Sequence, residues 1–178
     1  RPGCVGGILC TFRSRIMTES YVAVAGRIRR ELDRVETVVD RAQAIWADAD
    51  PEEGPDYHID AVALNLHGFY AGLERIFRTI ATRVDQSKPE GGNWHQELLE
   101  QMNTELPGVR PAVLSDASHK KLDRYRGFRH VVRNVYTFDF DPEQIGLLMK
   151  RLPETVEHVH EDLQAFADTL EQMARRDG

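Results

Sequence analysis

Apolar residues recur at intervals of three and four along most of this chain. This spacing places side chains on one face of an α-helix. Five segments show it, and turns rich in proline and glycine separate them. No segment alternates apolar and polar residues for long enough to require a strand, so the pattern predicts an all-α fold. The segments cover about 19–47, 56–85, 94–103, a stretch from near 115 that includes 124–136, and 141–175.

Four of these segments are long and the third is short, so we expect an antiparallel bundle of four long helices plus one short helix. A length of 178 residues suits one domain with its own core. Gly68 and Gly72, four residues apart, are expected to let another helix approach closely. Long helices with short links leave apolar surface for a second copy, and we therefore expect a homodimer.

Residues 1–16 differ from the rest of the chain. They hold both cysteines, three glycines and no acid, and they lack the helical periodicity. We interpret 1–16 as an upstream or artificially added extension without ordered structure, and 17–178 as the helical domain. A body without cysteine has no disulfide framework, which is typical of the cytoplasm. No apolar run approaches the ~20 residues of a membrane span, so we expect no membrane contact.

The segment 124–136 combines cations, imidazole and phenol on one helix face. Residues 120–133 hold six lysines and arginines against a single acid, Asp123, although the net charge of the chain is −6. At about 100° per residue, three arginines and Tyr136 fall within an arc of about 80°. His130 and Asn134 lie on the flank of this arc, and the opposite side is apolar. The three arginines are Arg126, Arg129 and Arg133.

Clustered arginines without acidic neighbours have two explanations. Acids from other helices could neutralise them across the core, which would make the cluster structural. Alternatively, the arginines bind phosphate, which a planar guanidinium grips through paired hydrogen bonds. A histidine beside them adds proton transfer near neutral pH. Arginine and histidine are in principle enough to cleave RNA without a metal, because the base takes the 2′-hydroxyl proton while the guanidinium stabilises charge on the phosphate.

The remaining histidines give no metal signal. His158 and His160 are two residues apart and therefore point to different sides of a helix. The others show no spacing known for zinc ligands. There is also no glycine-rich phosphate loop. We therefore expect no metal and no cofactor. The other histidines weighed are His58, His67 and His95.

Four segments carry a family resemblance: Asn-Leu-His-Gly-Phe-Tyr-Ala-Gly-Leu-Glu-Arg-Ile-Phe at 65–77, Trp-His-Gln-Glu-Leu-Leu at 94–99, Arg-Pro-Ala-Val-Leu-Ser at 110–115 and Tyr-Arg-Gly-Phe-Arg-His at 125–130. Together they resemble the HEPN superfamily, and within it the HepT-like proteins. The resemblance implies an all-α dimer acting as a metal-independent RNase toxin, with its active cleft at the dimer interface. It also implies a partner, an MntA-like minimal nucleotidyltransferase that silences the toxin by adding AMP to a tyrosine.

The family motif is an arginine, a polar residue, three residues of any kind, a histidine, one residue and a tyrosine. Here Arg129 and His130 match its start and Tyr136 its end, while Asn134 stands in the histidine position. An amide can orient a phosphate or a water but carries no proton. Either His130 takes over proton transfer, or the motif begins at Arg124. The resemblance thus implies catalytic Arg129, His130 and Asn134, substrate-binding Arg124, Arg126 and Arg133, and AMP modification of Tyr136.

Three functions follow from these observations. The favoured one is a HepT-like endoribonuclease toxin, in which Arg129 binds phosphate, His130 carries the proton and Asn134 orients the substrate. The alternative is a catalytically inactive HEPN module that binds a nucleotide or substrate and partners a nucleotidyltransferase. In that case Asn134 marks the loss of catalysis. The third is a structural interaction protein whose arginines are neutralised within the dimer.

Overall fold

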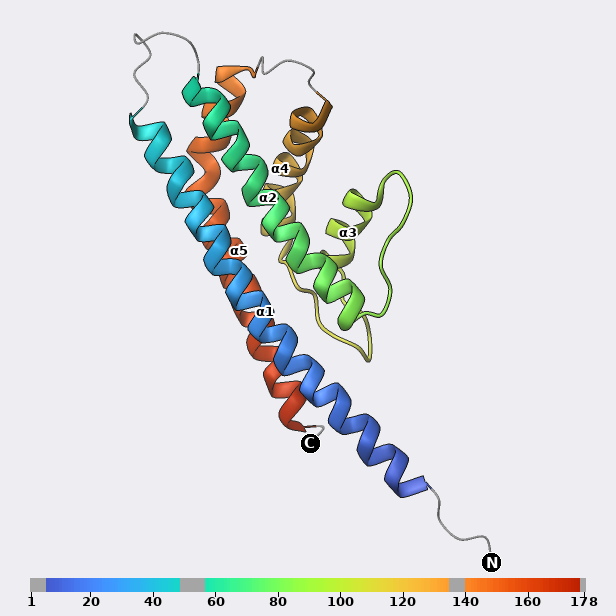
Figure 1. Cartoon of the computed structure of the whole chain (residues 1–178). Helices are drawn as coiled ribbons and strands as arrows, with labels where there is room; N and C mark the ends of the chain where they lie inside the picture. Colours follow the sequence, from blue (N-terminus) through green and yellow to red (C-terminus); the bar gives the residue numbers. More distant parts are fainter. Residues whose placement is uncertain (1–5, 49–56, 135–139, 177–178) are drawn as a thin grey trace, which may run out of the picture.

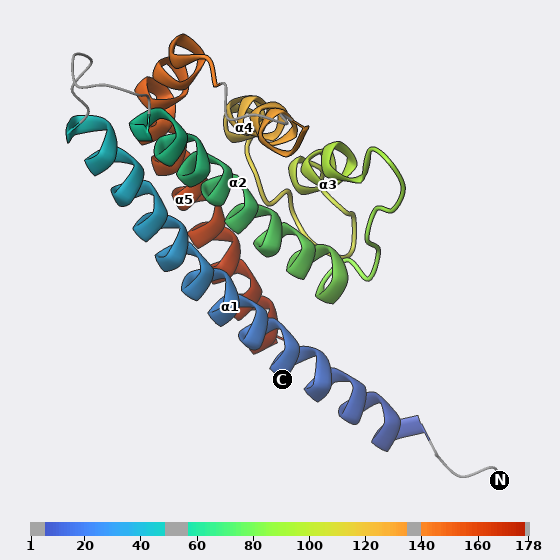
Figure 2. The same cartoon turned by 45° about the horizontal axis from the view of Figure 1, so that its top comes forward.

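The computed structural model describes residues 6–48, 57–134 and 140–176, and for 6–20 and Asn134 it describes the backbone alone. Five helices follow one another, and no strand occurs in these residues (Figures 1 and 2). They are α1 (Gly6–Asp48), α2 (Tyr57–Arg83), α3 (Trp94–Asn103), α4 (Asp116–Asn134) and α5 (Pro142–Arg176). The predicted all-α bundle of four long helices and one short helix is confirmed, since α3 has 10 residues. In the described parts, no helix is both long and apolar enough to cross a bilayer.

Helix α2 is the central element of the bundle. It packs against α1, α3, α4 and α5, whereas α1 packs against α2 and α5. Both views show α2 between α1 on one side and α3 and α4 on the other. Helix α1 runs opposite to both α2 and α5, as the colours in Figure 1 show. Each side of α2 therefore faces a different neighbour.

Capping residues fix where the later helices begin. The Ser115 hydroxyl accepts a hydrogen bond from the Ser118 backbone N–H at 3.3 Å and so caps α4. The Asp141 carboxylate accepts one from the Glu143 N–H at 2.9 Å, with Pro142 as the first residue of α5. The expected boundaries of α2 to α5 thus hold to within a few residues. We expect the first helix to begin near residue 19, whereas α1 begins at Gly6. The interpretation of 1–16 as an added extension stays a prediction.

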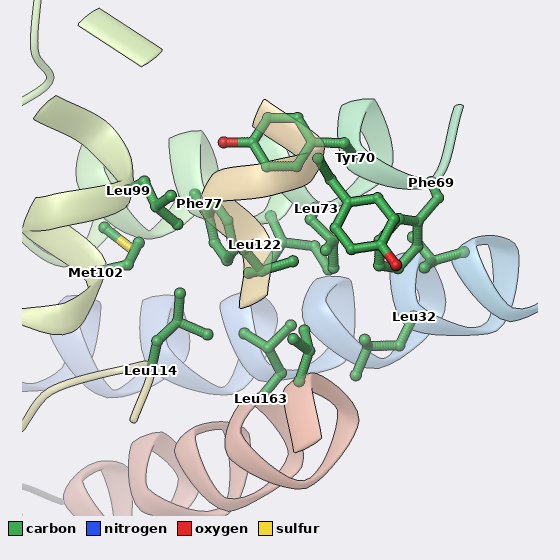
Figure 3. Packing of buried hydrophobic residues seen from close by; sticks show 14 of the residues in the cluster. Leu32, Phe69, Tyr70, Leu73, Phe77, Leu99, Met102, Leu114, Leu122 and Leu163 are labelled. Atoms are coloured by element: carbon green, nitrogen blue, oxygen red, sulfur yellow. The ribbon is translucent and has the colours of Figure 1, made fainter. Parts of the chain in front are cut away.

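The core is built from the apolar stripes of all five helices (Figure 3). Helices α1 and α2 approach each other closely at Gly72. A Cβ added there would lie 2.5 Å from Cγ2 of Val35, and one at Gly68 would lie 3.3 Å from Val38. Both glycines therefore serve helix packing, as the four-residue spacing predicted.

A buried ion pair fixes the loops on either side of α3. Arg110 meets both carboxylate oxygens of Asp85, at 2.6 Å from Nε and 2.8 Å from Nη2, and both side chains are fully buried. The same guanidinium donates to the backbone carbonyls of Gln101, Thr104 and Pro111. All five N–H donors of an arginine are therefore used. This arrangement joins the end of α2 to α3, and it makes Arg110 a structural residue.

We predict that Gly72→Ala lowers the free energy of unfolding by about 1–3 kcal/mol, because the added methyl meets Val35. Gly26→Ala is the matched control, since a Cβ at this helical position meets nothing within 4 Å. That substitution should raise stability by about 0.5–1 kcal/mol. Denaturant unfolding of both variants measures the difference, and equal effects would contradict the packing described.

Candidate functional site

A cavity of about 490 Å³ opens between α4 and the N-terminal turn of α3. Three arginines and two histidines line it, and no acidic side chain is among its described lining residues. The first turn of a helix also directs backbone N–H groups and a partial positive charge outward, which favours anions. The cavity is therefore strongly cationic in a chain of net charge −6. Its lining residues are Gly92, Asn93, His95, Gln96, Arg126, Arg129, His130 and Arg133.

The orientation of α4 places the arginines at this cavity. Tyr125 and Phe128 on its opposite side are buried. The Tyr125 hydroxyl donates to the Leu148 carbonyl at 2.9 Å, and its ring meets Phe69 edge-on at a centroid distance of 5.2 Å. These contacts fix the rotation of α4 about its axis. Arg126, Arg129, His130 and Arg133 consequently line one cavity, as the helical arc predicted.

Arg129 contacts two side chains, Glu74 and His95, that the sequence analysis does not assign to the site. Its Nε lies 3.0 Å from Oε2 of Glu74, and its Nη1 lies 3.1 Å from Nε2 of His95. His95 in turn contacts Glu74, with 2.5 Å between Nδ1 and Oε1. The Arg129 N–H at Nε is not aimed well enough for a hydrogen bond, so that contact is an ion pair by distance. Only 6% of the Glu74 side chain and 13% of that of Arg129 are exposed.

The partners of His95 determine its protonation state. Arginine can only donate a hydrogen bond, so Nε2 of His95 accepts from Arg129. Nδ1 therefore carries the proton and donates it to Glu74. Burial, and then the charges of Arg129, Arg133, Arg126 and Arg78, lower the pKa of His95 to about 4. The His95–Glu74 contact is thus a hydrogen bond from a neutral imidazole, while burial raises the pKa of Glu74.

Two more polar side chains of α2 lie near the arginines. Tyr70 is 1% exposed, and neither its hydroxyl nor Nε2 of His67 has a hydrogen-bond partner in the described structure. Burial raises the pKa of Tyr70, and burial followed by the charges of Arg129 and Arg133 lowers that of His67. In Figure 3 the Tyr70 ring lies at the edge of the labelled core side chains. Tyr70 and His67 therefore add no charge to this part of α2 near neutral pH.

The other candidate arginines have different surroundings. Arg126 pairs with Asp123 at 2.7 Å, one turn earlier on the exposed side of α4. Arg124 does not line the cavity and lies in a small recess between α4 and α5. Neither Arg124 nor Arg133 forms an ion pair with a described residue. Within the described structure, Arg129 meets a buried acid and Arg126 an exposed one, so internal pairing accounts for two of the four arginines.

Two predicted site residues cannot be placed. Asn134 is the last residue of α4, and its side chain lies outside the described residues. Tyr136 lies outside them altogether. Their roles in orienting the substrate and in receiving AMP stay predictions. Among the residues described, no three histidines, cysteines or acids come together in a way that could hold a metal ion.

The sequence contained a signal for the missed residues. Glu74 lies within the 65–77 segment and His95 within the 94–99 segment, both of which carry the family resemblance. Helical spacing relates residues within one helix, but it says nothing about pairs on different helices. Glu74, His95 and Arg129 come from α2, α3 and α4. Their meeting depends on tertiary packing.

The fold and the site define an all-α protein with a cationic, histidine-containing cavity. A family model described as HepT-like protein matches residues 61–170, which take in all of α3 and α4 and most of α2 and α5. The chain belongs to the HepT-like family. No curated protein and no solved structure matches it.

We predict that His95 stays neutral as the Nδ1–H tautomer at about pH 6, where an unperturbed histidine is mostly protonated. Nitrogen-15 NMR of the histidine side chains measures this. Because folding lowers the pKa to about 4, the unfolded chain binds more protons between about pH 4 and 6.5. The stability that His95 contributes is therefore lost as the pH falls through this window. A titration midpoint near 6.5 for His95 would contradict the network.

Proposed function

We propose that this protein is a HepT-like toxin that cleaves RNA without a metal ion in the α3–α4 cavity. One observation carries the proposal: Arg126, Arg129, Arg133, His95 and His130 line a single cavity. Three guanidinium groups in a cavity whose described lining holds no acid suit the phosphodiester backbone, although Arg126 and Arg129 each contact an acid outside that lining. His130 on the exposed side of α4 supplies an imidazole at the same cavity.

The proposed reaction uses the hydroxyl group that distinguishes RNA from DNA. The imidazole of His130 accepts the 2′-hydroxyl proton, and the 2′-oxygen attacks the adjacent phosphorus. The bond from phosphorus to the 5′-oxygen then breaks, and that oxygen takes a proton from solvent. The arginines stabilise the negative charge that develops on the phosphate oxygens. The products are a 2′,3′-cyclic phosphate and a 5′-hydroxyl end.

Arg129 is suited to hold the scissile phosphate. Glu74 and His95 contact its Nε and Nη1, and an arginine carries five N–H donors in a fixed fork. The two donors on Nη2 and one on Nη1 are left for a ligand in the cavity that Arg129 lines. A side chain fixed in this way loses less conformational freedom when substrate binds.

Regulation belongs to the same proposal. By the family resemblance, a second copy of the chain completes the active cleft, and an MntA-like nucleotidyltransferase adds AMP to Tyr136. The AMP phosphate would stand two residues beyond α4, which ends at Asn134. There it would compete with RNA for the arginines through charge and bulk. Asn134 orients the substrate in this scheme, and RNA cleavage takes place in the cytoplasm.

A second candidate function rests on Asn134 and on the clamped Arg129. With an amide in the usual histidine position, and with Arg129 tied to Glu74, the cavity would bind a nucleotide or RNA without cutting it. The chain would then be a catalytically inactive module that partners a nucleotidyltransferase.

Incubation of the purified protein with labelled single-stranded RNA in EDTA tests the activity. We expect fragments ending in cyclic phosphate. Arg129→Ala should lower the rate by about 100-fold or more, and His130→Ala by a similar factor. Since Arg129→Ala also leaves the buried Glu74 without its cation, the exposed Arg133 provides a second test, Arg133→Ala, that spares the fold.

Lys150→Ala, on the exposed side of α5, is the matched control and should keep full activity. Failure of the wild-type protein to cut RNA, with cutting gained in Asn134→His, would overturn the enzyme in favour of the inactive module. Unchanged cleavage in Arg129→Ala and Arg133→Ala would exclude the cavity as the active site.

A further inference from the structure

A second cationic cavity lies in the groove between α1 and α2. It has a volume of about 450 Å³, and four arginines and one glutamate are among its lining residues. The arginines are Arg27, Arg30 and Arg34 of α1 and Arg75 of α2. Ile28 and Ile76 form its apolar floor, since both are buried. We call this cavity the α1–α2 groove.

The charge in this groove is not balanced. Glu31 pairs with two of the arginines, at 2.6 Å from Arg75 and 3.1 Å from Arg34. Arg27 and Arg30 are exposed, and neither forms an ion pair with any described residue. A solvated helix face usually mixes both signs. Here one carboxylate faces four guanidinium groups in an acidic chain, so the groove favours an anionic ligand.

The groove and the α3–α4 cavity lie on adjoining sides of α2. Glu74 contacts Arg129 of the cavity, and the next residue, Arg75, lines the groove. Successive residues point about 100° apart around a helix of about 10–12 Å diameter. The two sites are therefore about one helix width apart. Both views agree, since α2 lies between α1 and the pair α3 and α4 (Figures 1 and 2).

Arg78 provides a cation between the two sites. It lies one turn beyond Glu74 and about 40° around the helix, between the directions of Glu74 and Arg75. Arg78 is exposed, and its guanidinium lies 5.3 Å from the ring centre of Trp94. The Trp94 ring meets that of His95, which lines the α3–α4 cavity. Cations thus continue across α2 from one site to the other.

We propose that the α1–α2 groove binds the phosphate backbone of the same RNA strand whose scissile phosphate occupies the α3–α4 cavity. This inference rests on the proposed function and specifies its substrate as a single strand of several nucleotides. A strand that reaches both sites has to cross the width of α2, about 10–12 Å, and therefore needs more than a dinucleotide. Arginines beside a partly exposed aromatic ring are typical of surfaces that follow single strands.

The double variant Arg27→Ala/Arg30→Ala tests the groove, because both side chains are exposed and outside the core. Fluorescence anisotropy would measure its binding to RNA of about 16 nucleotides and to a dinucleotide. We expect about tenfold weaker binding of the long RNA. The slope of log affinity against log salt concentration should become shallower by about 1.4, at about 0.7 for each phosphate that the variant no longer neutralises. Dinucleotide binding should not change.

Lys150→Ala/Arg176→Ala is the matched control, with two exposed cations removed from α5. It should bind both RNAs like the wild-type protein. Arg133→Ala should weaken the binding of both. Unchanged affinity for long RNA in Arg27→Ala/Arg30→Ala, or an equal loss in the control, would overturn the groove as an RNA site.

The two proposals can fail separately. Cleavage of RNA by the wild-type protein, with no effect of the groove variant on binding, refutes the groove alone. Groove-dependent binding without cleavage refutes the ribonuclease and supports RNA binding across α2. If the wild-type protein binds no RNA and the groove variant loses binding of an acidic peptide such as polyglutamate, the groove is a protein-docking surface and the RNA proposal is wrong.

Discussion

The buried carboxylate of Glu74 is the contact on which the arrangement of the site depends. A lone charge in a helix bundle is costly, and two partners from different helices offset the cost: Arg129 of α4 and His95 of α3. The same contacts fix the guanidinium of Arg129 and select one tautomer of His95. Without Glu74, Arg129 would lose the carboxylate that orients it.

Helix α2 combines three roles because successive residues face different neighbours. Gly72 admits α1 at close range, Glu74 faces α3 and α4, and Arg75 turns toward the α1–α2 groove. The rigid packing at Gly72 therefore also sets the spacing of the two cationic sites. The bundle core thereby helps to set the geometry of the proposed binding surface. A shift of α1 against α2 would move Arg27 and Arg30 relative to the α3–α4 cavity.

The sequence was enough to predict the fold, because period-three-and-four apolar stripes and capping residues such as Asp141 act locally. It was also enough to predict that Arg126, Arg129 and Arg133 share a face, since one helix carries all three. It could not predict that Glu74 and His95 meet Arg129, because that requires three helices to pack in one register. Helical spacing also leaves Arg124 off this face, about 140° from Arg129, and the structure has it in the recess between α4 and α5.

An NMR titration with a single RNA strand whose 2′-hydroxyl groups are blocked, so that it binds without being cut, tests the cationic site most directly. The arginine Nε–H and histidine imidazole resonances would be followed. The resonances of Arg126, Arg129, Arg133 and His95 should shift together at low strand concentration. Shifts confined to residues away from both cationic sites, with the Arg129 and His95 signals unchanged, would contradict this prediction.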